Sequence, residues 1–143
     1  MRTSLWLCSF LLATLVSSLS FAEQKVIAGN YEIHYIVIPT TFLRPSIAHE
    51  YGLPRGKNKA LVNVSVLTTE GRAVTADISG RTHNLLEQSQ PLKFTKVEEG
   101  QAIYYLALFV HADEEHHRIE LDITLPGNTR KKISFMQKMY WEE

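Results

Sequence analysis

The feature that most limits the possible folds is an alternation of apolar and polar residues with a period of two. It is clearest in the segment 118–125, where Ile119, Leu121, Ile123 and Leu125 alternate with charged or polar residues. Successive side chains of a β-strand point to opposite faces, so this pattern predicts a strand with one face in a core and the other in water. Such half-buried strands are typical of antiparallel sheets.

Six further segments carry strand signals and are bounded by residues that favour turns. The predicted strands cover 29–38, 61–67, 74–79, 92–97, 102–110 and 132–140. The turn at Glu70-Gly71 is expected to pair 61–67 with 74–79, and 102–110, which is apolar on both faces, is expected to be the most central strand. About seven strands in a chain of this length favour an all-β, antiparallel, immunoglobulin-like β-sandwich, with a barrel as the alternative.

The first 22 residues have the three parts of a secretory signal peptide. Arg2 precedes an apolar stretch over 5–19, and Ser20-Phe21-Ala22 places small residues where a signal peptidase cuts. The apolar stretch is shorter than the roughly 20 residues that cross a bilayer. We therefore expect a signal peptide over 1–22, a single domain over 23–143, and no transmembrane segment in the mature chain.

Cysteine usage and charge indicate the compartment and exclude some partners. Cys8 is the only cysteine and lies in the predicted signal peptide, so thiol catalysis and cysteine metal sites are excluded from the mature protein. A cysteine-free exported domain is compatible with the bacterial periplasm. The 15 basic and 15 acidic residues cancel, which argues against nucleic acid as a partner.

The segment 40–58 is the least generic part of the chain. Residues 46–51 predict one or two helical turns between Pro45 and Gly52, inside a long connection between strands. Long ordered loops on a strand scaffold are a common place for binding residues. The candidate binding residues are Phe42, Tyr51, Arg55, Lys57 and Asn58.

A second candidate site is the segment 111–117, expected at a hairpin tip after the strand 102–110. Imidazole and carboxylate groups are suitable ligands for zinc or copper, and His111, Asp113, His116 and His117 could supply them. The alternative is a solvated acidic turn with flanking histidines. In that case the protein is expected to have no cofactor.

Catalytic motifs are absent from the sequence. Glu32 and His34 share one face of the strand 29–38 and could form a pair, but no nucleophile is implied beside them. A histidine hydrogen-bonded within the sandwich is the simpler interpretation of His34. Whether the protein is an enzyme stays open, with the balance toward a non-catalytic role.

Several of these segments together resemble a known family. The resemblance is carried by 29–35, 41–43 with Pro45, 51–52, Arg55, 57–58, 61–66, 103–107 and 135–140. In this combined pattern the chain resembles a family of small exported γ-proteobacterial proteins defined by a domain of unknown function, DUF4426. The resemblance implies an immunoglobulin-type sandwich and supplies no activity, substrate or cofactor. It includes the loop 40–58 and omits the histidine-rich segment.

The sequence therefore predicts an exported periplasmic protein of unknown activity. The leading hypothesis is a non-catalytic binding or accessory module that engages a periplasmic or envelope protein through the loop and the neighbouring sandwich face. The alternative is a metal-binding or metal-delivery protein that uses the His/Asp-rich segment.

Overall fold

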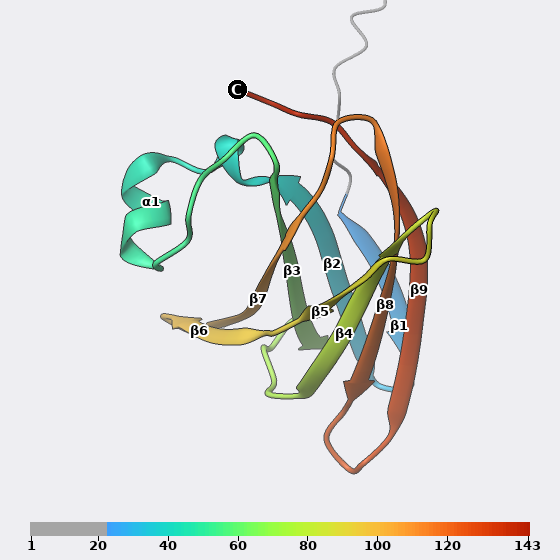
Figure 1. Ribbon diagram of the computed structural model, residues 1–143. Coiled ribbons are helices and arrows are strands. Elements are labelled where there is room, and N and C mark those ends of the chain that lie inside the picture. Colours follow the sequence, from blue (N-terminus) through green and yellow to red (C-terminus); the bar gives the residue numbers. More distant parts are fainter. Residues whose placement is uncertain (1–22) are drawn as a thin grey trace, which may run out of the picture.

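The structure is a computed structural model that describes residues 23–143, which form two antiparallel β-sheets packed face to face (Figure 1). The first sheet contains, in order, β1 (Gln24–Ala28), β2 (Tyr31–Pro39), β3 (Lys59–Thr68), β7 (Ala102–Val110) and β6 (Thr95–Glu99). The second contains β5 (Ser89–Leu92), β4 (Asp77–Asn84), β8 (Glu115–Thr124) and β9 (Arg130–Met139). The predicted sandwich is confirmed, and the predicted signal peptide over 1–22 lies outside the described residues.

The core lies between the sheets and is made by the alternation that the sequence shows. On β2, Ile33 and Val37 are buried while Glu32 and His34 face outward. Along β8 and the residue that follows it, every second residue from Ile119 to Leu125 is almost completely buried. No helix within residues 23–143 is long and apolar enough to span a membrane.

The described chain has nine strands, two more than the sequence predicts. The additional strand β1 precedes the first predicted one, and the predicted strand 92–97 is divided between the end of β5 and most of β6. The predicted strand 74–79 is wrong in position and pairing, because β4 lies over 77–84 and pairs with β5 and β8. A single bridge between Leu67 and Ala73 is what remains of the expected hairpin.

The expectation that 102–110 is the most central strand is also wrong. The middle strand of the first sheet is β3, while β7 lies between β3 and the edge strand β6. The apolar outer face of β7 is half-exposed, since the short helical segment after β2 covers it only in part.

Three connections carry the chain from one sheet to the other: β3 to β4, β5 to β6, and β7 to β8. The segment 111–114 is therefore an arch between the two sheets and not the tip of a hairpin as predicted. Because an arch closes the end of a sandwich, side chains at its base are directed into the core.

The loop between β2 and β3 contains η1 (Thr40–Phe42) and α1 (Pro45–Glu50), which confirms the helical turn predicted over 46–51 to within one residue. Pro45 occupies the first turn of α1, where a missing N–H costs nothing. Gly52 follows with φ +63°, a left-handed conformation suited to glycine at a helix end.

Candidate functional site

The two candidate sites of the sequence meet at one end of the sandwich. The Asn58 carbonyl accepts a hydrogen bond from His111 N (3.0 Å), which joins the β2–β3 loop to the β7–β8 arch. The C-terminal tail lies against both, near the top of Figure 1. Trp141 donates from its backbone N to Asp113 Oδ1 (2.9 Å) and from Nε1 to the His111 carbonyl (3.2 Å). We call this surface, made by residues 40–42, 55–58, 111–114 and 140–143, the loop end.

A cation–π contact and a pair of hydrogen bonds hold the long loop in place. Lys57 Nζ lies 4.6 Å from the centre of the Trp141 ring. Thr40, which is fully buried, donates from Oγ1 to the Gly56 carbonyl and accepts from Gly56 N, both at 3.0 Å. Arg55 donates to the Thr41 carbonyl (2.9 Å), so its side chain stabilises the loop from outside. The loop end is thus ordered by its own contacts.

Aromatic side chains are exposed on this ordered surface. Phe42, Tyr140 and Trp141 are 52%, 42% and 43% exposed. Rigid aromatic side chains give a large contact area at a small cost in conformational entropy, which is why they act as anchors in protein interfaces. Four of the five predicted binding residues belong to the loop end. Phe42 is exposed on it, and its internal contacts are made by Arg55, Lys57 and Asn58.

Tyr51 lies apart from this surface. It follows α1 and reaches the edge of the first sheet, where its hydroxyl donates to Glu99 Oε2 (2.9 Å). That hydrogen bond raises the pKa of the Tyr51 phenol, with burial and the charge of Glu99 acting in the same direction.

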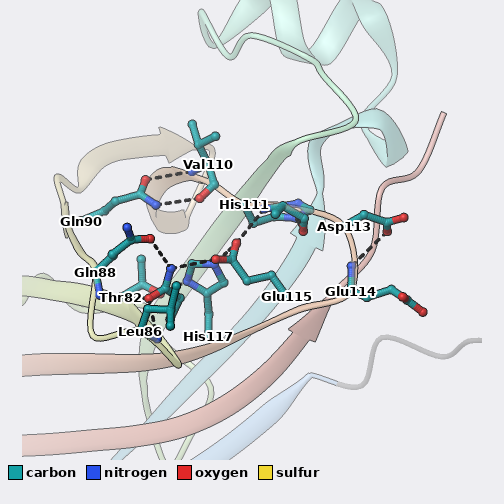
Figure 2. Close-up of polar contacts among 12 residues, drawn as sticks. Thr82, Leu86, Gln88, Gln90, Val110, His111, Asp113, Glu114, Glu115 and His117 are labelled. Carbon is teal, nitrogen blue, oxygen red and sulfur yellow. Dashed lines mark hydrogen bonds and ion pairs between the residues drawn. The ribbon is translucent and has the colours of Figure 1, made fainter.

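Beneath the arch lies a buried polar network (Figure 2). The His117 ring, 1% exposed, contacts Glu115 Oε2 through Nε2 (2.9 Å) and Thr82 Oγ1 through Nδ1 (2.7 Å). Because a carboxylate only accepts, Nε2 carries a proton toward Glu115, and in the neutral form of the ring Nδ1 accepts from the Thr82 hydroxyl. Glu115 also accepts from Ala112 N and from Asn84 Nδ2.

These contacts give Glu115 three donors and lower its pKa. Burial acts to raise the pKa of this carboxyl group, but the hydrogen bonds from Ala112 N, the His117 ring and Asn84 outweigh it. The Glu115 carboxylate therefore links the arch to β4 and holds both in one arrangement.

The same network orders the turn between β4 and β5. Asn84 Oδ1 accepts from the backbone N of Leu86 (3.0 Å) and of Gln88 (2.9 Å), while its Nδ2 also donates to Gln88 Oε1. The turn displays Leu85 and Leu86, which are 71% and 80% exposed. An asparagine that uses both its acceptor and its donors thus supports an apolar tip.

The four histidine and aspartate residues proposed as metal ligands do not converge. His116 and His117 are neighbours on β8 and point to opposite faces of the sheet. Asp113 Oδ1 accepts hydrogen bonds from Glu114 N and Trp141 N. Within residues 23–143 no three histidine, cysteine, aspartate or glutamate side chains are grouped so as to hold an ion.

His111 has a buried ring nitrogen that is unpaired in the described chain. Its ring is 3% exposed, and Nδ1 lies 2.9 Å from the Ala112 carbonyl, which can only accept. In the neutral form of the ring Nε2 is then the acceptor atom, and it has no hydrogen-bond partner in the described chain.

Two arrangements resemble parts of a catalytic site without forming one. Thr82, His117 and Glu115 follow the order hydroxyl, imidazole, carboxylate, but Thr82 is fully buried, so no substrate reaches its oxygen in this conformation. The predicted Glu32–His34 pair is present, with Glu32 Oε2 3.2 Å from His34 Nε2, on the outer face of the first sheet.

Three residues were not predicted from the sequence: Asn84, Glu115, and Gln90, whose side chain bonds both backbone groups of Val110. Polar residues in predicted turns or strands give no sign that they will be buried, and their roles depend on pairing between segments far apart in the chain. A turn-favouring Asn84 before two leucines is the one local signal that could have been used.

Comparison with known proteins identifies the family. The profile of a domain of unknown function, DUF4426, matches residues 25–142. The chain belongs to the DUF4426 family. A crystal structure of a DUF4426 family protein from Pseudomonas aeruginosa has 30% sequence identity and a TM-score of 0.76, covering 85% of this chain and 97% of that one. No curated protein matches the sequence.

Two more distant structures share the fold. FetP of uropathogenic Escherichia coli, expressed recombinantly in the periplasm, is 13% identical with a TM-score of 0.62, over 88% of this chain and 100% of that one. A copper-bound variant of FetP is 14% identical with a TM-score of 0.62, over 83% and 95%. At this identity the similarity concerns the fold.

Proposed function

We propose that the protein is an exported periplasmic binding module that engages an envelope protein through the loop end and has no catalytic role of its own. The observation that carries the proposal is the meeting of three separate segments in one ordered surface with half-exposed aromatic side chains. The loop, the arch and the tail are joined through His111, Asp113, Trp141 and Lys57. Order before binding reduces the entropy lost on association.

The periplasmic part of the proposal is supported by the signal-peptide pattern over 1–22 and by the lack of cysteine in the domain. The expression of the structurally similar FetP in the periplasm is compatible with it.

Site-specific photo-crosslinking in intact cells tests the proposal. A photoreactive amino acid replaces Phe42 or Tyr140 at the loop end, and Ser134 on the outer face of β9 in the control. We expect one envelope protein to be captured from both loop-end positions and not from the control. The double substitution Arg55→Ala and Lys57→Ala should reduce that capture while the domain stays folded. Equal capture from all three positions would contradict the proposal.

Metal binding is the second candidate function. The unpaired Nε2 of His111 and the copper-bound form of FetP, which shares the fold, support it. Titration of the purified domain with Zn²⁺ or Cu²⁺ tests it, since an ion that binds the folded state raises the melting temperature, and raises it more the tighter it binds. Loss of the shift in His111→Ala would assign the site, and an unchanged melting temperature would remove this candidate.

A further inference from the structure

The outer face of β7 carries an apolar cleft away from the loop end. Tyr105 and Phe109 of this strand face the core, whereas Leu106 and Leu108 face outward and remain half-exposed. The segment after α1 covers them only in part and leaves a cleft of about 300 Å³. The cleft is lined by Tyr51, Gly52, Leu53, Pro91, Lys93, Thr95, Val97, Leu106, Ala107 and Leu108.

The strand that forms the floor of the cleft has a gap in its hydrogen bonding. Leu106 pairs with Thr95, the first residue of β6. Four residues further along β7, the Gln90 side chain takes the place of a strand at Val110: its Nε2 donates to the Val110 carbonyl (2.6 Å) and its Oε1 accepts from Val110 N (3.0 Å; Figure 2).

Between these two positions Leu108, which pairs with Leu61 of β3 on its other side, has no partner on the β6 side. In an antiparallel strand the N–H and C=O groups of every second residue point to the same neighbouring strand. Those of Leu108 therefore point toward the β6 side, as do those of Leu106 and Val110. No backbone hydrogen bond from Leu108 to residues 93–94 is formed in the described chain. The gap arises because the chain crosses between the sheets there.

A cation lies beside this gap. Lys93 lines the cleft, is exposed, and forms no ion pair with any residue in 23–143. Lys96, two residues into β6, is instead paired with Glu98 at 3.0 Å. Tyr51, which also lines the cleft, donates its hydroxyl to Glu99 at the far end of β6. An anionic group is therefore favoured at the Lys93 end of the cleft.

We propose that this cleft binds a short extended peptide that carries an apolar side chain next to a carboxylate, such as an apolar C-terminal residue. The peptide main chain pairs with the N–H and C=O of Leu108, as in recognition by strand addition. Its apolar side chain packs against Leu53 and Leu106, and its carboxylate lies near Lys93. The cleft is at the small end of the range for ligand pockets, about 300–1,000 Å³, which suits one or two residues.

An amide ligand is favoured over an acyl chain by the unpaired backbone groups. A fatty acid offers the apolar part and the carboxylate but has no N–H to pair with the Leu108 carbonyl. This site is independent of the loop end, so its test and the crosslinking test can fail separately.

The probes are N-acetyl-Val-Leu with a free carboxylate and the same dipeptide with an amidated C-terminus. Each is titrated into the ¹⁵N-labelled domain, and amide chemical shifts are followed. We expect the largest changes at residues 51–53, 93–97 and 106–108, and binding of the free acid about two- to fivefold tighter than the amide, as for an exposed ion pair.

Matched variants separate charge from packing. Lys93→Gln should remove the difference between the two probes, while Lys131→Gln, a second lysine without an ion-pair partner in the described chain, should preserve it. Leu53→Asn should weaken both probes. Shift changes elsewhere on the domain, or equal binding of the acid and the amide, would overturn the proposal. Stronger binding of decanoate at the same resonances would overturn it in favour of an acyl carboxylate.

Discussion

Replacing Glu115 with glutamine tests whether the buried network beneath the arch stabilises the fold. The carboxylate accepts from Ala112 N, the His117 ring and Asn84 Nδ2, and its side chain is 22% exposed. Glutamine of nearly the same shape has one accepting oxygen, so its NH₂ group must face at least one donor. An unpaired buried donor costs about 1–3 kcal/mol, and the remaining bonds lose their charge assistance.

We therefore expect Glu115→Gln to lower the free energy of unfolding by about 2–4 kcal/mol at pH 7. For a domain of about 120 residues this corresponds to a fall in melting temperature of about 8–16 °C. Glu114→Gln is the matched control, since Glu114 is exposed beside it and should change stability by less than about 0.5 kcal/mol. Urea unfolding followed by circular dichroism measures both variants.

The pH dependence gives an independent check. The pKa of Glu115 is lowered in the folded state, where burial is outweighed by the hydrogen bonds from Ala112 N, His117 and Asn84. Its contribution to stability is therefore present above the pKa of an unfolded glutamate and is lost as pH falls through the folded pKa. The difference between wild type and Glu115→Gln should shrink on acidification below about pH 4. An equal difference at pH 7 and pH 3 would refute the reasoning, as would wild-type stability of the variant at pH 7.

Three further substitutions test neighbouring contacts. Thr82→Val removes the hydroxyl that pairs with His117 and should cost about 1–3 kcal/mol in urea unfolding; no change would mean that the bond does not stabilise the fold. Gly80→Ala places a Cβ against the Glu120 carbonyl of β8 and should cost about 4 kcal/mol or more, seen as loss of folded protein; a stable variant would contradict the close strand approach. Trp141→Ala should speed hydrogen exchange of the His111 amide, and unchanged exchange would show that the tail does not stabilise the arch.

The strands with clean alternation could be predicted from the sequence because each buries one face. The bounds of the predicted strands 118–125 and 29–38 agree with those of β8 and β2 to within a few residues. The error at 74–79 has a physical cause. In β4 the burial of Thr82 and Asn84 depends on hydrogen bonds, and Gly80 allows a close approach to the β8 backbone, neither of which hydrophobicity reports.

The candidate site was predicted in pieces that the sequence could not join. The loop 40–58 and the segment 111–117 each have an unusual composition, but their contact through Asn58 and His111 depends on the arch between sheets. The same arch explains why the histidines do not form the expected cluster. Strand β8 begins at Glu115, and alternation then directs His116 outward and His117 inward.

The distribution of free strand edges supports the cleft as a specific site. An unprotected edge invites association with another chain, and proteins blunt edges with charges or proline. Here β9 carries Arg130, Lys131, Lys132 and Lys138, β6 carries Lys96, Glu98 and Glu99, and β5 contains Pro91. The unpaired position at Leu108 differs because it lies inside a cleft and spans one residue between β6 and Gln90. A short gap of this kind is too limited for a full strand of a second copy, yet it offers the donor and acceptor that one peptide unit requires.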